Sequence, residues 1–179
     1  MKKVLIISTS LRQNANSEIL AKETEKGARD SGHEVEFISL KDKNINFCKG
    51  CMACQKLGKC VLNDDANIIT EKMKESDVIV WATPVYYYEM SGQMKTLIDR
   101  ANSLYATGFK FKDVYLITTS ADSSDNVVQT VLAGLKGWCA CLPGSNIKGY
   151  INGAGLDNPN EVLNRKDLLE QAYNMGKCL

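Results

Sequence analysis

The sequence predicts a doubly wound α/β fold, in which five parallel strands form one sheet between two layers of helices. Two observations predict this three-layer α/β/α arrangement. Five short runs of β-branched and aliphatic residues alternate along the chain with stretches of helical periodicity. Parallel neighbours need crossover connections, and right-handed helical crossovers cover both faces of the sheet. A length of 179 residues suits one domain, so we expect a single domain over residues 1–179.

The expected strands are residues 3–9, 34–40, 77–83, 112–119 and 147–152. The first (KVLIIST) and the third (DVIVWAT) are nearly continuous apolar runs, which is typical of parallel strands buried on both faces. The second (EVEFISL) alternates between polar and apolar residues. Pro84 is expected to close the third strand, because proline cannot donate a ladder hydrogen bond, and residues 84–92 are then a long loop.

Helical periodicity follows each strand. The first helix is expected from Ser17 to about Gly32, and the second begins at Asp64 or Asp65 with Ile68, Ile69 and Met73 facing inward. The remaining helices are expected at residues 93–104, 125–138 and 160–176, with Ser124 or Asp125 capping the fourth. A cysteine-rich insertion at about residues 44–63 interrupts this alternation.

The balance of charges excludes some partners. The formal net charge is +1, whereas nucleic acid and anionic membranes select a concentrated excess of Lys and Arg. The apolar run near the start, residues 4–7, is too short for an export signal, and no run approaches the roughly 18 apolar residues of a membrane span. We therefore expect a cytoplasmic protein with reduced thiols, no nucleic-acid partner and no membrane partner.

Three loops should meet where the parallel strands end, because ligands of such sheets bind beyond the carboxyl ends of the strands. The first loop lacks G-x-G-x-x-G and surrounds a helix N-terminus, which favours an anion, although a plain capped helix start is the alternative. The second places three tyrosines at a strand end, where they could flank an aromatic ring or form a subunit interface. The third, residues 118–125, could hydrogen-bond the edge of a heterocycle.

Three segments resemble the NADPH-dependent FMN reductase family of the flavodoxin-like superfamily. They are N-A-N-S in the first loop, the cysteine-rich insertion leading into N-D-D, and T-P-V-Y-Y-Y-E-M-S-G-Q-M-K-T-L-I-D-R. The resemblance covers residues 1–130 and implies a flavodoxin-like fold, bound FMN and a homodimer or homotetramer. Ser8 departs from the family pattern, since many relatives carry Gly there. The resemblance implies phosphate contacts from Ser8, Ser10, Arg12, Asn16 and Ser17, and isoalloxazine contacts from Pro84, Val85, Tyr86, Tyr87, Thr119, Ser120 and Ala121.

Four of the seven cysteines, Cys48, Cys51, Cys54 and Cys60, have the spacing C-x2-C-x2-C-x5-C. The compact run is similar to that of the iron-sulfur flavoproteins, a branch of the same family, and favours a [4Fe-4S] cluster over the two separated knuckles of structural zinc. With one histidine in the chain, a mixed Cys/His zinc site is not expected. The alternative is that the thiols hold no metal and pack as small hydrophobes.

The function expected from these features is an FMN-dependent NAD(P)H oxidoreductase, which passes electrons from nicotinamide through FMN to a quinone, a flavin or an iron-sulfur acceptor. Hydride transfer to FMN requires no acid, base or nucleophile from the protein, so no catalytic side chain is assigned. Two alternatives stay open: an iron-sulfur flavoprotein that carries electrons between proteins, and a non-redox binding module stapled by zinc or thiols.

Overall fold

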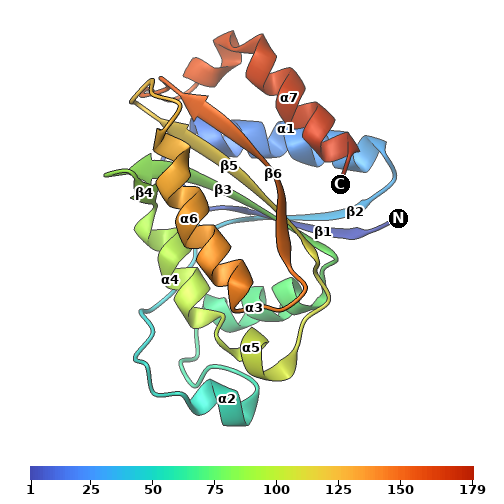
Figure 1. Cartoon of the computed structure of the whole chain (residues 1–179), viewed down its shortest axis with the longest axis vertical. Coiled ribbons are helices and arrows are strands. Elements are labelled where there is room, and N and C mark those ends of the chain that lie inside the picture. The colour runs from blue at the N-terminus through green and yellow to red at the C-terminus, as the bar shows by residue number, and fades with distance from the viewer.

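A computed structural model describes residues 1–179 and shows a parallel sheet with the strand order β2-β1-β3-β5-β6 (Figure 1). The fold is therefore the predicted doubly wound, flavodoxin-like one. A two-residue sixth strand, β4, pairs antiparallel with the end of β3. The strands are β1 (Lys3–Ser8), β2 (Glu34–Ser39), β3 (Val78–Tyr86), β4 (Glu89–Met90), β5 (Asp113–Ser120) and β6 (Asn146–Ala154).

Helices cover both faces of this sheet. One face carries α1 and α7, which lie side by side, and the other carries α3, α4 and α6 (Figure 1). None of the helices is both long and apolar enough to span a bilayer. The helices are α1 (Asn16–Asp30), α2 (Ala53–Leu57), α3 (Asp65–Glu75), α4 (Gly92–Arg100), α5 (Ser103–Thr107), α6 (Val127–Ala140), the short 3-10 helix η1 (Glu161–Asn164) and α7 (Lys166–Lys177).

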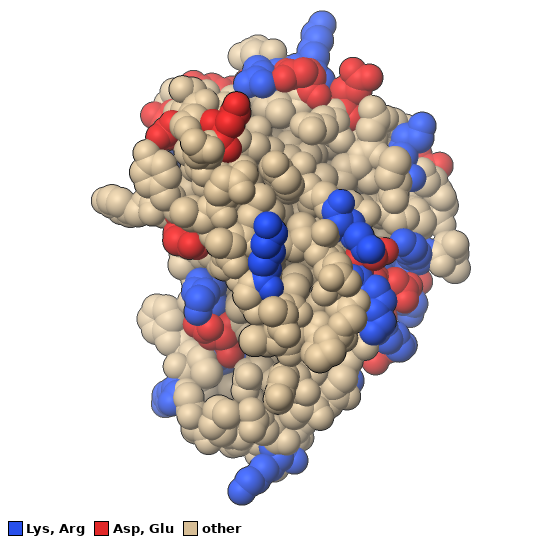
Figure 2. Space-filling view, in the orientation of Figure 1, with Lys and Arg blue, Asp and Glu red and all other residues tan.

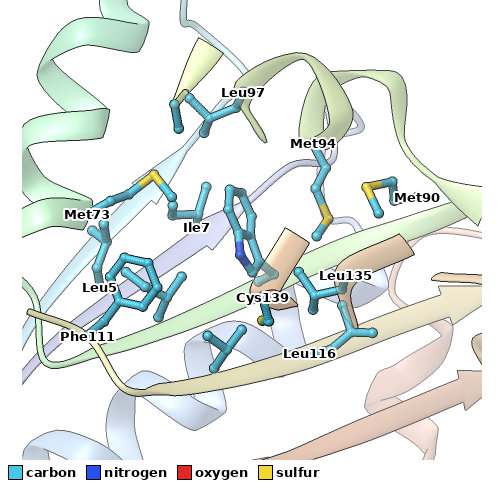
Figure 3. Close-up of a cluster of buried hydrophobic side chains, with 14 of the residues drawn as sticks. Leu5, Ile7, Met73, Met90, Met94, Leu97, Phe111, Leu116, Leu135 and Cys139 are labelled. Atoms are coloured by element: carbon cyan, nitrogen blue, oxygen red, sulfur yellow. The ribbon is translucent and has the colours of Figure 1, made fainter. Parts of the chain in front are cut away.

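Strand β1 shows why its sequence is apolar without alternation. Val4 and Ile6 belong to the core under α1 and α7, whereas Leu5 and Ile7 belong to the core under α3, α4 and α6. Successive side chains of a strand point to opposite faces, so a strand that is covered twice must be apolar at every position. Figure 3 shows the second core, where methionine and leucine side chains from the helices point toward the sheet.

The segment after β3 differs from the expected loop. Pro84 does not end the strand, which continues to Tyr86 and turns back into β4. The turn residues Tyr87 and Tyr88 have φ angles of 50° and 62°. Two successive positive φ values match the tight hairpin turns that glycine and asparagine usually occupy. The sequence signal for a hairpin was therefore missing, and the prediction of a long loop was wrong.

Three helix predictions also need correction. The helix expected at residues 93–104 ends at Arg100, and a separate short helix starts at Ser103. Ile68 was expected to face inward but is 60% exposed, because Ile69 and Met73 define the buried stripe of α3. Neither Ser124 nor Asp125 precedes α6 directly, since the residue in the N-cap position is Asn126.

A buried ion pair ties the cysteine-rich insertion to α4. The guanidinium of Arg100 donates to both carboxylate oxygens of Asp64, from Nη1 at 2.6 Å and from Nη2 at 2.8 Å. Burial alone would raise the pKa of Asp64, but hydrogen bonds from Arg100 and Asn46 hold that pKa well below its ordinary value. Asp64 also caps α3 by accepting from the backbone N–H of Ala66. One carboxylate therefore fixes a helix start and the end of the insertion.

The contact between α1 and α7 depends on two glycines. A Cβ added at Gly176 would lie 2.1 Å from the carbonyl oxygen of Thr24, and one added at Gly27 would lie 2.0 Å from the carbonyl oxygen of Tyr173. No side chain fits at either distance, so the two backbones approach as closely as they do only because both positions lack a Cβ.

We predict that Gly176→Ala destabilises the protein by about 1 to 3 kcal/mol, the usual cost of overpacking, measured by urea unfolding. Gly137→Ala is the matched control, because a Cβ at this position in the last turn of α6 meets nothing within 4 Å. The control should gain about 0.5 to 1 kcal/mol from helix propensity. Equal effects of the two changes would contradict this account of the helix contact.

We predict that Asp64→Ala lowers the free energy of unfolding by about 3 to 5 kcal/mol, because it leaves the buried charge of Arg100 without its partner. The control is Asp99→Ala, which removes an exposed i,i+4 pair with Lys95 and should cost under about 0.5 kcal/mol.

The lowered pKa of Asp64 also sets a pH dependence. The pair stabilises the folded state above about pH 4, the ordinary range of an unfolded Asp, and this stabilisation is lost as the pH falls toward the lowered pKa. Urea unfolding of the Asp64→Ala protein should therefore show a weaker loss of stability on acidification than the unchanged protein. An equally steep loss in both would exclude Asp64 as the source.

Candidate functional site

The three loops expected to converge do line one pocket at the carboxyl edge of the sheet. Ten of the twelve residues predicted for a flavin site line it, and Ser8 and Tyr87 do not. Ser8 is fully buried in β1, and Tyr87 is fully exposed at the hairpin tip. The ten are Ser10, Arg12, Asn16, Ser17, Pro84, Val85, Tyr86, Thr119, Ser120 and Ala121.

A fourth loop, between β6 and η1, completes the pocket and was not predicted. It contributes Leu156, Asp157 and Pro159. The signal for it was the strand order, since β6 lies beside β5 and ends at the same edge. The prediction covered the residues at the ends of β1, β3 and β5 and left out those that follow β6.

This fourth loop is held by two of the five residues expected to contact the phosphate, Asn16 and Arg12. The Asn16 side chain donates to the carbonyl of Asn158 at 2.9 Å and accepts from the backbone N–H of Val162 at 3.1 Å. Arg12 donates through Nη1 to the carbonyl of Asp157 at 2.8 Å. Both ends of the Asn16 amide are thus used inside the protein, whereas Arg12 uses one nitrogen and keeps further donors.

The N-terminus of α1 faces this pocket without a side-chain cap. Asp64 and Ser91 cap α3 and α4, but the N-cap residue of α1 is Ala15, which has no polar side chain. Ser17, in the first turn, is fully buried, and its Oγ has no hydrogen-bond partner. Buried hydroxyls normally find a partner, and free N–H groups at a helix start favour an anion. The arrangement therefore fits a phosphate group in the pocket.

The hairpin beside the pocket is anchored to the opposite loop. The Tyr88 hydroxyl donates to Oδ2 of Asp122 at 2.6 Å, and Thr130 of α6 donates to the Tyr88 carbonyl. The hydrogen bond to Asp122 raises the pKa of Tyr88 and lowers that of Asp122. These contacts hold Tyr86, which is 45% exposed, at the mouth of the pocket.

The cysteine-rich insertion builds a second cavity. Cys48, Cys51, Cys54 and Cys60 all line it, together with Asp99, Arg100 and Asn102 from the end of α4. All seven cysteines of the chain are free thiols. The structure does not bring three of these side chains into a metal-ligating group. The other three cysteines lie outside this cavity: Cys139 is buried, whereas Cys141 and Cys178 are exposed.

Hydrogen-bond donors surround the sulfurs of this second cavity. Asn102 donates from Nδ2 to Sγ of Cys54 at 3.3 Å, and the backbone N–H of Gly50 donates to Sγ of Cys48 at 3.4 Å. Burial would lower the pKa of Arg100, but Asp64 and the Cys60 thiol hold that pKa above its ordinary value. Donors directed at sulfur are what thiolate ligands require, so the chemistry of the cavity fits a cluster bound through cysteines.

Comparison with known proteins agrees with this geometry. An iron-sulfur flavoprotein of Methanocaldococcus jannaschii is 42% identical over 98% of this chain and 94% of its own. One from Archaeoglobus fulgidus is 40% identical over 56% of this chain and 45% of its own. An NAD(P)H:quinone oxidoreductase from Methanothermobacter marburgensis shares the fold, with a TM-score of 0.74 and 14% identity over 98% of this chain and 96% of that one.

Residues 2–149 match the family described as NADPH-dependent FMN reductase. The matched region contains the first three loops of the sheet-edge pocket and the whole cysteine-rich insertion. It supports a flavin-dependent oxidoreductase that uses FMN and NAD(P)H, and it leaves no support for the non-redox binding module. This chain belongs to the NADPH-dependent FMN reductase family.

Proposed function

We propose that this protein is an iron-sulfur flavoprotein, in which electrons pass between FMN in the sheet-edge pocket and a [4Fe-4S] cluster held by Cys48, Cys51, Cys54 and Cys60. The observation that carries the proposal is that all four thiols of the insertion line one cavity, in which the sulfurs of Cys48 and Cys54 accept hydrogen bonds from N–H groups. The relative from Methanocaldococcus jannaschii, an iron-sulfur flavoprotein, supports the same interpretation.

In the pocket, the protein would bind and orient FMN. The first turn of α1, the Ser17 hydroxyl and the free nitrogens of Arg12 would receive the phosphate. Pro84, Val85 and Tyr86 would flank the ring system from one side. The residues at the end of β5, Thr119, Ser120 and Ala121, would meet its polar edge. Bound FMN supplies the ability to take up two electrons together and release them singly.

In the insertion, the four thiolates would hold the cluster, which supplies a one-electron couple. The insertion also carries four exposed lysines, Lys43, Lys49, Lys56 and Lys59, and no acidic residue between Asp42 and Asp64. At the end of the molecule where Figure 1 places α2, Figure 2 shows blue side chains and no red ones on the visible face. This surface favours a negatively charged protein as the electron-transfer partner.

A second candidate is an NAD(P)H oxidoreductase that uses a quinone or a flavin as acceptor. The half-exposed Tyr86 at the pocket mouth favours it, because a nicotinamide could stack beside the flavin there. In either case we expect a homodimer or homotetramer, since Tyr86, Tyr87 and Tyr88 are 45%, 100% and 56% exposed on one hairpin.

We predict that Ser17→Ala weakens FMN binding about tenfold, because a hydrogen bond to a charged group contributes about 1.5 to 3 kcal/mol. The same change should not destabilise the apoprotein, since the Ser17 hydroxyl has no partner to lose. Ser8→Ala is the matched control: its hydroxyl is equally buried and unpartnered but lies outside the pocket. Fluorescence titration with FMN measures both, and an equal loss of affinity in the two variants would argue against a phosphate at Ser17.

The proposed function is tested on protein prepared anaerobically. We expect bound FMN, iron and sulfide, and we expect the double variant Cys51→Ser/Cys54→Ser to lose iron and sulfide while keeping FMN. Cys141→Ser/Cys178→Ser changes two exposed thiols outside the cavity and should keep all three. Iron retained by the first variant would remove the insertion as the cluster site. Prompt bleaching of the flavin by NADPH would favour the second candidate as the physiological activity.

A further inference from the structure

Arg100 has one hydrogen-bond donor that the protein leaves unused. Its side chain is 0% exposed. Nη1 donates to the carbonyl of Asn46 at 2.7 Å, Nη2 donates to the carbonyl of Leu62 at 3.2 Å, and both bind Asp64. The fifth donor, Nε–H, is buried and has no partner. Buried polar groups of native proteins are almost always paired, so this orphan group indicates a missing acceptor.

The surroundings of Arg100 indicate which acceptor is missing. The residue lines the cavity of the four cysteines, together with Cys60. Its hydrogen bonds to Asn46 and Leu62 clamp the chain on both sides of the cysteine run. Two residues further on, Asn102 already donates to Sγ of Cys54. At the end of α4 and just after it, one donor therefore already reaches a sulfur of the cavity, and a second, Nε of Arg100, has no partner.

We propose that Arg100 and Asn102 are positioning residues for the cluster, which donate hydrogen bonds from Nε and Nδ2 to the sulfurs of Cys60 and Cys54 and raise the reduction potential. This inference rests on the proposed function. Reduction adds one electron and no proton, so the cluster and its thiolates gain one negative charge. A donor to a ligand sulfur offsets negative charge and stabilises the reduced form more than the oxidised form. Because Asp64 neutralises the guanidinium charge, the effect comes from the hydrogen bond rather than from net charge.

The variant Arg100→Lys separates the donor from the charge. In lysine, the methylene Cε occupies the place in the chain that Nε occupies in arginine, while the ammonium group stays available to Asp64. We expect Arg100→Lys to bind the same iron and sulfide per chain but to shift the midpoint potential downward. The expected decrease in the midpoint potential is about 59 mV, which corresponds to a tenfold change in the ratio of oxidised to reduced cluster for a one-electron couple.

Asp64→Asn is the control for a loosened clamp. This change weakens the same ion pair but leaves the Nε donor of Arg100 in place. It also removes the negative charge that balances the guanidinium, so the midpoint potential should rise or stay unchanged. A merely structural role would move both variants in the same direction. Asn102→Leu removes the second donor and should lower the potential as Arg100→Lys does, and it serves where Arg100→Lys fails to fold.

Spectroelectrochemical titration of the anaerobic protein gives the result. A lowered potential in Arg100→Lys and Asn102→Leu, with none in Asp64→Asn, supports the proposal. An unchanged potential in a donor variant with full iron content would overturn it, as would an equal decrease in Asp64→Asn. Absence of iron and sulfide from the unchanged protein would instead refute the proposed function, so the two failures are distinguishable.

Discussion

The alignment of the parallel strands is the constraint on which the pocket depends. Each crossover returns the chain to the edge of the sheet where the previous strand began. The strands β1, β3, β5 and β6 therefore run parallel and all end at the opposite edge. Loops that are separated by more than 140 residues in the chain then become neighbours, as the hydrogen bonds between Asn16 and both Asn158 and Val162 show. The pocket is thus a consequence of topology, and its individual side chains decide only what it binds.

The fold could be predicted because its main signal is local. A strand buried on both faces is apolar at nearly every position, and β1 and β3 carry that pattern with few interruptions. The tyrosine hairpin could not be predicted in the same way. Its turn holds Tyr87 and Tyr88 at positive φ, a conformation that the sequence does not favour and that contacts with Asp122 and Thr130 stabilise. Tertiary contacts decide such a segment, and they lie outside any local pattern.

The site was predictable in part for a related reason. Residues directly after a predicted strand, such as Ser10, Pro84 and Ser120, can be placed at the edge from the order of elements alone. What each side chain does there depends on long-range partners. Asn16 looked like an anion donor, but the fourth loop occupies its amide, whereas the buried hydroxyl of Ser17 stays without a partner. Only the structure separates a residue that holds the pocket together from one that is available to a ligand.

The two sites are held in place by different interactions. The pocket belongs to the sheet edge and would exist without residues 44–63. The cysteine cavity lies between an irregular loop and the end of α4, and the loop is fastened chiefly by hydrogen bonds that converge on Arg100 and Asp64. A buried ion pair contributes little net stability compared with apolar packing, but it strongly disfavours any arrangement that separates its charges. Arg100 and Asp64 thus specify one position for the insertion relative to α4. A bound cluster requires this fixed position of its ligands more than it requires added stability.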